Sequence, residues 1–272
     1  MSAALRVAAA QAESVPGDVG ANVRAAVSLV ESAAEAEARV VVLPELFLTG
    51  YAPEAWTIEQ TLTPEDDRLQ PLRQAARERG VVVVAGAALR RAPGQATVSL
   101  VVVDETGAVT APYAKQHLFD AERRFFTPGD HGASIVVDGW ELGLGVCYDG
   151  CFPEHAAAAA ADGARAYLCP AAYYVGSEHR RDLYYAARAL DNGIYVVFAG
   201  LTGRCGTNAF NGGSAIYDPE GRPLDRLGAE APAIAVADLL AAEVERVQEM
   251  NPIARDRLAT LGSRTREVLG AR

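Results

Sequence analysis

Residues 141–154 read ELGLGVCYDGCFPE: a short apolar run, a cysteine, and a proline of the kind that opens a helix. The run Glu141–Val146 predicts a buried strand, and the alanine-rich stretch Pro153–Asp162 predicts a helix. Cys147 therefore falls at a strand-to-helix junction, where the field of a helix N-terminus is expected to lower the pKa of a thiol. Backbone N–H groups of the same turn can hold a developing oxyanion. A buried, inert cysteine is the alternative interpretation.

Two other predicted strands end in side chains suited to acid–base chemistry. Glu45 follows the run Arg39–Leu43, at the carboxyl end of a buried strand, where open α/β sheets usually bind ligands. In apolar surroundings its pKa is expected to rise and it can act as a base; capping of the next segment is the alternative. Lys115 ends the run Val109–Lys115, a position where a lysine is commonly just solvated. His117 is interpreted as a packed or hydrogen-bonded histidine, not as a base.

Short apolar runs alternate with helical patterns along the whole chain. The predicted strands are Arg6–Ala10, Arg39–Leu43, Val81–Gly86, Val98–Asp104, Val109–Lys115, Ser134–Val137, Glu141–Val146, Ala164–Cys169, Ile194–Ala199, Gly213–Tyr217, Pro223–Leu227 and Ala233–Val236. The predicted helices are Gly20–Ala38, Pro64–Arg79 (with Gly80 as its left-handed cap), Pro153–Asp162 and His179–Asn192. This order predicts a single α/β domain over residues 1–272, with buried sheets and helical outer layers. The tail from about residue 240 to 272 is predicted to be helical and to take part in packing or oligomerisation.

Charge and composition exclude several classes of partner. The chain has 272 residues, half of them apolar, and a formal net charge of −10. An acidic surface without a dense basic cluster repels phosphate groups, so we expect neither a nucleic acid nor an anionic membrane as partner. The start of the chain lacks an uninterrupted apolar segment, and the longest alanine run, 156–161, is far shorter than the roughly 20 residues of a membrane helix. A soluble protein is expected.

The cysteines indicate reduced thiols. Cys147, Cys151, Cys169 and Cys205 lack the spacing of a disulfide framework or a zinc site, so we expect a cytoplasmic protein without a bound metal. A thiol-redox function of Cys147 and Cys151 is a competing hypothesis, although a disulfide between them requires a distorted turn.

Taken together, the motifs resemble the nitrilase superfamily of carbon–nitrogen hydrolases. A strand-end Leu-Pro-Glu45 is followed in order by Tyr-Ala-Lys115-Gln-His-Leu-Phe and by Cys147-Tyr-Asp with Phe-Pro-Glu after it. The similarity runs from Ala-Ala-Gln11 to the Asp-Pro-Glu-Gly221 region. This resemblance implies a four-layer α-β-β-α sandwich that forms a homodimer or larger homo-oligomer. It also implies that the enzyme needs no metal and no organic cofactor.

The resemblance further implies a role for each residue that matches a family motif. Cys147 is expected to be the nucleophile, Glu45 the general base, and Lys115 the cation that stabilises the tetrahedral intermediate. Glu122 is expected to position substrate and water. The backbone N–H of Tyr148 is expected to help hold the oxyanion.

The third motif favours an amidase. Its form, Cys-Tyr-Asp, is similar to amidase-like branches, whereas nitrilases usually carry Cys-Trp-Glu. Branches that bind carboxylate-bearing substrates place an Arg three or four residues after the nucleophile, and here Gly150 and Cys151 occupy those positions. We therefore expect a neutral, small or apolar acyl group, although Arg180, Arg181 or Arg204 can substitute for the missing guanidinium.

The expected substrate is thus a small carboxamide or N-carbamoyl amine, hydrolysed by water. Tyr51, Tyr173 and Tyr174 are expected to line its pocket, with simple packing as the alternative for each. Two competing hypotheses are a nitrilase and a catalytically idle binding protein of the same fold. The presence of Glu45, Lys115, Cys147 and Glu122 together argues against the idle form.

Overall fold

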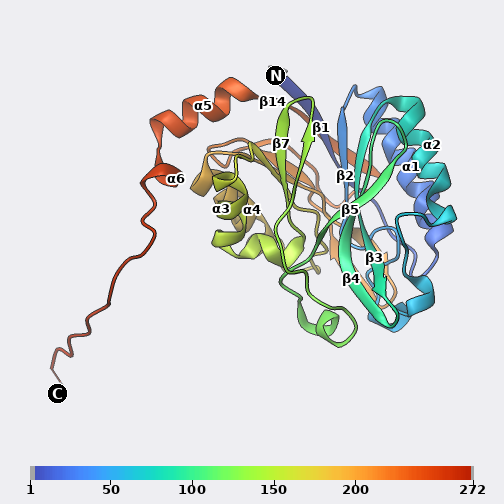
Figure 1. The fold of residues 1–272 in the computed structure, drawn as a ribbon, viewed down its shortest axis with the longest axis horizontal. Coiled ribbons are helices and arrows are strands. Elements are labelled where there is room, and N and C mark those ends of the chain that lie inside the picture. Colours follow the sequence, from blue (N-terminus) through green and yellow to red (C-terminus); the bar gives the residue numbers. More distant parts are fainter. Residues whose placement is uncertain (1–3, 271–272) are drawn as a thin grey trace.

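Two six-stranded sheets lie face to face between two pairs of helices in the computed structural model, which describes residues 4–270 (Figure 1). Helices α1 (Val19–Glu35) and α2 (Gln70–Arg79) pack together outside the first sheet, and α3 (Pro153–Ala161) and α4 (Glu178–Asn192) outside the second. The predicted four-layer α-β-β-α sandwich is confirmed.

Each sheet has a parallel centre and antiparallel edges. The first sheet has the order β14-β1-β2-β3-β4-β5 and the second the order β13-β12-β9-β8-β7-β6. The strands of the first are β1 Ala4–Gln11, β2 Val40–Leu43, β3 Val82–Ala92, β4 Gln95–Val103, β5 Val109–Ala114 and β14 Ala233–Leu240. Those of the second are β6 Ser134–Val137, β7 Trp140–Leu144, β8 Ala166–Leu168, β9 Tyr195–Phe198, β12 Ala215–Tyr217 and β13 Pro223–Arg226. Strands β1, β2 and β3 run parallel, as do β7, β8 and β9.

The apolar character of the central strands follows from this position. Every residue of β2, β8 and β9 is buried, because helices cover one face of each sheet and the other sheet covers the opposite face. A buried polar contact also joins the two sheets. The Ser214 backbone N–H donates to Oε1 of Gln11 over 2.9 Å, and the Ser214 hydroxyl donates to the Ala10 carbonyl over 3.2 Å. These hydrogen bonds tie the end of β1 to the segment before β12.

Local signals explain the helix ends. The Asp18 carboxylate caps α1 by accepting the N–H of Ala21 over 2.9 Å. Gly80 ends α2 with φ 65°, as its position after the helical pattern predicts. Helix α2 begins later than predicted, at Gln70, because the preceding residues Asp67–Leu69 form a separate 3₁₀ turn.

The sequence pattern did not reveal every element. Strands β10 (Thr202–Cys205) and β11 (Asn208–Asn211) form a two-stranded hairpin for which no strand was predicted. These strands are only four residues long and mix polar with apolar residues, so they carry no clear alternation.

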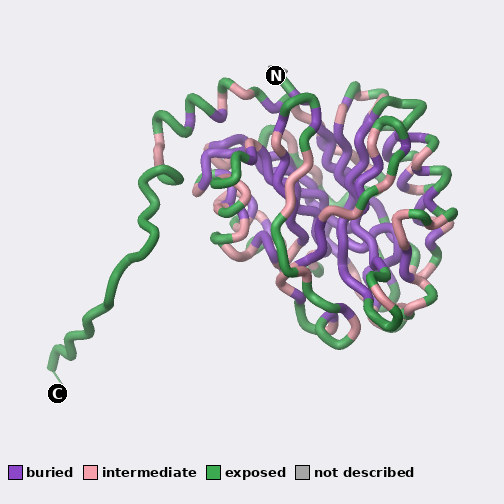
Figure 2. The backbone as a smooth tube through the Cα atoms, viewed as in Figure 1, coloured by how far each residue is buried: buried purple, intermediate pink, exposed green. Residues whose placement is uncertain are grey.

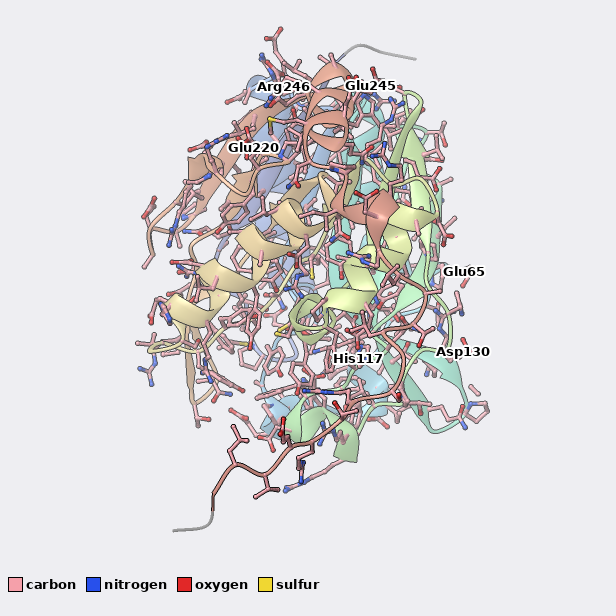
Figure 3. All side chains as sticks on the ribbon, turned by 90° about the vertical axis from the view of Figure 1, so that its left-hand side faces the viewer. Glu65, His117, Asp130, Glu220, Glu245 and Arg246 are labelled. Carbon is pink, nitrogen blue, oxygen red and sulfur yellow. The ribbon has the colours of Figure 1, made fainter. Side chains whose placement is uncertain are left out.

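The tail leaves the body of the molecule. Helix α5 (Ala241–Met250) is fixed to the body by Arg246, whose guanidinium lies 3.1 Å from Glu220 (Figure 3). After the short helix α6 (Ile253–Asp256), residues 257–270 are exposed and form neither helix nor strand, so the described tail is helical only in its first part (Figure 2). Within residues 4–270 no helix is both long and apolar enough to cross a membrane.

A close backbone contact positions the loop after β2. Gly86 in β3 donates its N–H to the Pro44 carbonyl over 3.1 Å and accepts the N–H of Leu48 over 3.0 Å. A Cβ atom at Gly86 would stand 2.4 Å from the Pro44 oxygen and 2.6 Å from Cα of Glu45. Only glycine therefore lets β3 approach the segment that carries Glu45.

We predict that Gly86→Ala destabilises the protein by about 1–3 kcal/mol, because the added methyl group must displace backbone. The free energy of unfolding in urea measures the effect. Gly132→Ala is the matched control, since a Cβ there meets nothing within 4 Å. Equal stability of the two variants would contradict this account of Gly86.

Candidate active site

The candidate site lies where strands of both sheets end. Glu45 follows β2 and Lys115 follows β5 in the first sheet, whereas Cys147 follows β7 in the second. Glu122 comes from the 3₁₀ turn Asp120–Arg124, shortly after Lys115 in the chain. The structure thus brings together all four side chains that the sequence singled out for catalysis.

Lys115 is the centre of this cluster. Its Nζ atom lies 2.6 Å from Oε1 of Glu45 and 2.8 Å from Oε1 of Glu122. The side chains of all three residues have no exposed surface. One ammonium group therefore bridges two carboxyl groups below the molecular surface.

Burial and the attraction between opposite charges act in opposite directions on the pKa values of this cluster. Burial raises the pKa of Glu45 to about 7, the charge of Glu122 adds to the rise, and the Lys115 ammonium opposes it. Burial works against the charged form of Lys115, but the neighbouring Glu45, Cys147 and Glu122 outweigh it and hold the pKa of Lys115 well above its ordinary value. Lys115 therefore stays an ammonium, while Glu45 can take up and release a proton near neutral pH.

The Glu122 carboxyl group accepts three hydrogen bonds. Besides Lys115, the Tyr51 hydroxyl donates to its Oε1 over 2.6 Å and the Phe119 backbone N–H donates to its Oε2 over 2.9 Å. Tyr51 is itself almost fully buried, with 3% of its surface exposed. The carboxyl group of Glu122 thus has a defined orientation, and Tyr51 supports it as well as lining the pocket.

Cys147 has a strained backbone with φ 48°, in the left-handed region that favours glycine. Its N–H donates to the Pro170 carbonyl over 2.8 Å, so this group is not free to bind an oxyanion. Among residues 4–270, the Tyr148 N–H has no backbone hydrogen-bond partner outside its own 3₁₀ turn, Cys147–Cys151. The first N–H groups of a helical turn lack acceptors within the turn, which leaves that of Tyr148 available.

The expected lowering of the Cys147 pKa is wrong. Burial raises the pKa of this thiol well above its ordinary value, and the charge of Glu45 raises it further, against the opposing effects of Lys115 and the Ala172 N–H. The sequence showed the helix that starts at Pro153 but not the burial of the sulfur or the carboxylates of Glu45 and Glu122 near it, which disfavour the thiolate. A buried thiol next to a carboxylate is neutral at rest, so it needs a base to ionise it.

Asp149 fixes the turn that carries the cysteine. Its buried carboxylate accepts the Val146 N–H over 3.1 Å, the Tyr113 hydroxyl over 2.6 Å and the His117 N–H over 2.9 Å. The His117 ring lies 2.9 Å from the same carboxylate at the surface below α3 (Figure 3). His117 is therefore a hydrogen-bonded histidine, as the sequence indicated, and Asp149 ties the turn of Cys147 to the loop of Lys115.

A cavity of about 230 Å³ opens beside Cys147. Six of its 13 lining residues are aromatic, and they include the three tyrosines that the sequence proposed as pocket residues. The lining residues are Tyr51, Phe119, Cys147, Tyr148, Cys151, Ala172, Tyr173, Tyr174, Val175, Gly176, Ser177, Arg180 and Tyr184. Cys147, which is partly exposed, faces this space. A small organic molecule can thus reach the sulfur.

The three arginines considered as substitutes for a motif arginine lie in different environments. Arg181 is buried and donates to Oδ1 of Asn211 over 2.7 Å and to the Gly212 carbonyl over 2.9 Å. Arg204 is exposed in β10 and is not part of the cavity wall. Arg180 is exposed and lines the cavity.

The cysteines are all free thiols in the structure. Cys151 also lines the cavity, and its sulfur lies 3.4 Å from the Tyr173 hydroxyl. Cys169 is fully buried. Among residues 4–270, no group of three or more His, Cys, Asp or Glu side chains is arranged to hold a metal ion.

Comparison with known proteins identifies the family of this chain. A family model described as carbon-nitrogen hydrolase matches residues 6–249. The chain belongs to the carbon–nitrogen hydrolase family. This hydrolase is 34% identical to the deaminated glutathione amidase of Escherichia coli O157:H7, covering 87% of this chain and 91% of that one. It is 33% identical to a nitrilase of Pyrococcus abyssi, with coverages of 87% and 90%.

The solved structure of a similar protein supports the same family assignment. The hydrolase is similar to an amidase from Nesterenkonia sp. AN1, solved as a double mutant with acrylamide, with a TM-score of 0.83, 32% identity and 95% coverage of both chains. In another structure of that amidase, the acetamide moiety of fluoroacetamide is covalently attached to the active-site cysteine. That amidase is a member of the nitrilase superfamily. The prediction of a nitrilase-type carbon–nitrogen hydrolase is therefore confirmed.

Some residues of the site had no signal of their own in the sequence. The Ala172 N–H acts on the Cys147 sulfur through the backbone, so its residue type says nothing about it. Tyr184 lines the cavity from α4, where a tyrosine is equally compatible with packing. Asp149 stands in the cysteine motif, but only the folded chain shows what its carboxylate binds.

Proposed function

We propose that this hydrolase cleaves small primary carboxamides to a carboxylic acid and ammonia, through a thioester on Cys147. The observation that carries the proposal is the buried Lys115 ammonium, which lies between Glu45 and Glu122 beside a thiol that faces a small cavity. A neutral amide is a poor electrophile. It needs a nucleophile, a proton for the leaving nitrogen and a charged group to stabilise its oxygen.

In the proposed acylation, Glu45 takes the proton of the Cys147 thiol as the sulfur attacks the carbonyl carbon. Glu45 is suited to this step because its pKa of about 7 lets it accept and donate protons near neutral pH. The C=O electron pair moves to oxygen, where the Lys115 ammonium and the Tyr148 N–H stabilise the negative charge. The C–N bond then breaks, Glu45 donates its proton to the leaving nitrogen, and ammonia departs.

Deacylation repeats these steps with water as the nucleophile. Glu45 takes a proton from water, the hydroxide attacks the thioester, and the C–S bond breaks to release the acid. Cys147 regains its proton from Glu45. Glu122 is suited to position water and substrate, because Lys115, Tyr51 and the Phe119 N–H fix the direction of its carboxyl group. Tyr173 and Tyr174 are proposed to hold the acyl group, since both line the cavity.

We also propose that residues 1–272 form one domain that assembles as a cytoplasmic homodimer or larger homo-oligomer. The four free thiols support a reducing compartment. The tail supports assembly, because Leu258 and Leu261 are 68% and 88% exposed on a segment that leaves the body (Figure 2). Together with Ile253 these leucines line one hollow of the surface, and contiguous exposed apolar side chains commonly mark an interaction surface.

Cys147→Ala is expected to abolish ammonia release from amides, because it removes the nucleophile, while the circular dichroism spectrum stays unchanged. The assay is ammonia release across a panel of small amides, N-carbamoyl amines and nitriles. Cys151→Ala is the matched control, since Cys151 lines the same cavity, and it is expected to keep its turnover. Turnover by Cys147→Ala would remove the nucleophile assignment. Hydrolysis of nitriles alone by the wild type would favour the nitrilase hypothesis.

The rate of Cys147 alkylation by iodoacetamide should rise as the pH rises through about 7, because Glu45 must be ionised to accept the thiol proton. Below that pH the protonated carboxyl group cannot act as a base, so kcat/KM for an amide should fall in the same range. In Glu45→Gln the rise in the alkylation rate near pH 7 should be absent. If the rise persists in Glu45→Gln, a group other than Glu45 is responsible for it.

If the tail mediates assembly, replacing both Leu258 and Leu261 by Asp should shift the protein towards the monomer, because charged side chains oppose burial in an interface. Multi-angle light scattering measures the mass. Leu224→Asp, at a residue 48% exposed on β13, is the control. An unchanged oligomer in the double variant would show that the tail is not part of the interface.

A further inference from the structure

The peptide unit between Cys147 and Tyr148 carries both the carbonyl of the nucleophile and the N–H proposed to bind the oxyanion. Because this peptide bond is planar and trans, its C=O and N–H groups point in opposite directions. A contact that fixes the Cys147 carbonyl therefore also fixes the direction of the Tyr148 N–H. The peptide unit on the other side of Cys147 is already held, since the Cys147 N–H donates to the Pro170 carbonyl over 2.8 Å.

Tyr185 is the side chain that contacts this carbonyl. It lies in the middle of α4, and its hydroxyl donates to the Cys147 carbonyl oxygen over 3.3 Å. Tyr185 has no exposed surface. Burial raises the pKa of its hydroxyl well above the ordinary value, so the group stays protonated and remains a donor. The hydroxyl oxygen also accepts the Cys169 thiol over 3.9 Å.

The ring of Tyr185 is fixed by close packing. Its centroid lies 4.4 Å from that of Phe198 and 6.0 Å from that of Tyr173. On the side of the cysteine turn, Gly150 packs directly against the ring, because a Cβ atom at Gly150 would stand 2.8 Å from Cε1 of Tyr185. The absence of a side chain at Gly150 thus lets α4 bring a tyrosine hydroxyl to the backbone of the nucleophile.

The hydrogen bond to the carbonyl also acts on the N–H of the same peptide unit. A hydrogen bond accepted by the C=O group polarises the amide and strengthens its N–H as a donor. The effect is reciprocal, so the Tyr185 contact strengthens when the Tyr148 N–H binds a negatively charged oxygen. At 3.3 Å the contact is longer than most O–H···O hydrogen bonds, and contacts of this kind tighten in the transition state.

We propose that Tyr185 is a positioning residue for the oxyanion site, which orients and strengthens the Tyr148 N–H through the Cys147–Tyr148 peptide unit. This inference rests on the proposed thioester mechanism. Tyr185 is fully buried and does not line the cavity, so it does not touch the substrate. Its contribution falls in the transition states of acylation and deacylation, in which the oxygen is charged, and not in the binding of a neutral amide.

The test compares Tyr185→Phe with the wild type on a small neutral amide such as butyramide. The variant should lower kcat and kcat/KM by the same factor, about 5- to 20-fold, with KM nearly unchanged. Removal of an oxyanion donor itself costs roughly 100- to 1,000-fold, so a group that acts through the donor has a smaller effect.

Tyr195→Phe is the matched control. Tyr195 is also buried, and its hydroxyl likewise donates to a backbone carbonyl, that of Leu240, over 3.4 Å. This carbonyl belongs to the end of β14 and not to the cysteine turn. Tyr195→Phe should therefore keep the wild-type kcat, and urea unfolding measures the stability that each Phe variant loses.

A second measurement separates the proposed role from a general disturbance of the cysteine. Methyl methanethiosulfonate transfers its methylthio group to the Cys147 sulfur: an S–S bond forms, methanesulfinate leaves and Glu45 takes the thiol proton. No charge develops on a carbonyl oxygen, so this reaction does not use the oxyanion site. The rate of Cys147 modification, followed by mass spectrometry of its peptide, should differ less than about twofold between Tyr185→Phe and the wild type.

Gly150→Ala tests the same contact from the other side. Its methyl group meets the Tyr185 ring, so the hydroxyl must move away from the carbonyl. We expect the pattern of Tyr185→Phe, with amide turnover reduced more than Cys147 modification. In the double variant the two effects should not add, because both changes remove the same contact.

Each outcome decides the inference. Unchanged amide kinetics in Tyr185→Phe would overturn it, whereas turnover by the wild type would leave the amidase function intact. An equal loss of amide turnover and of Cys147 modification would also overturn it, since that pattern indicates a displaced nucleophile. A wild type that hydrolyses no amide would instead overturn the proposed function, and the inference with it.

Discussion

The ammonium of Lys115, buried between Glu45 and Glu122, is the interaction on which the rest of the site depends. Taking three charges out of water is costly, and their mutual attraction offsets that cost only when the geometry is tight. Here the two contacts measure 2.6 and 2.8 Å, and none of the three side chains is exposed. The cluster also sets the chemistry, because it keeps Lys115 charged and lets Glu45 exchange protons near pH 7.

The fold can be understood as the frame that holds this cluster against a thiol. The cluster comes from the first sheet and Cys147 from the second, so the two sheets must be held in a fixed relation. Gly86 lets β3 approach the Glu45 segment, and the Gln11 and Ser214 contact joins the sheets. Asp149 connects the strained turn of Cys147 to the loop that follows Lys115. A reactive geometry is thus maintained by groups that do not themselves react.

The cavity wall and the buried charged cluster are made of different residues. Glu45, Lys115 and Glu122 have no exposed side-chain surface, and burial strengthens the charge interactions among them. The cavity wall consists of aromatic and small residues together with Arg180, which is exposed. Such an arrangement lets substrate preference change through wall residues while the buried cluster stays the same.

The sequence by itself determined the alternation of strands and helices, the four-layer fold through its motifs, and the identity of Glu45, Lys115, Cys147 and Glu122. The alternation depends on local patterns, such as strand-length apolar runs and a glycine like Gly80 after a helix, whereas the four-layer fold and the choice of these four residues followed from the resemblance of the ordered motifs to a known family. Only the tertiary structure decided the direction of the Cys147 pKa shift and the hydrogen bonds by which Asp149 anchors the turn. It also decided that Arg181 is buried and hydrogen-bonded whereas Arg180 lines the cavity. The reason is physical: a pKa or an ion pair depends on burial and on neighbours brought in from distant parts of the chain, and adjacent residues of one helix can face opposite environments.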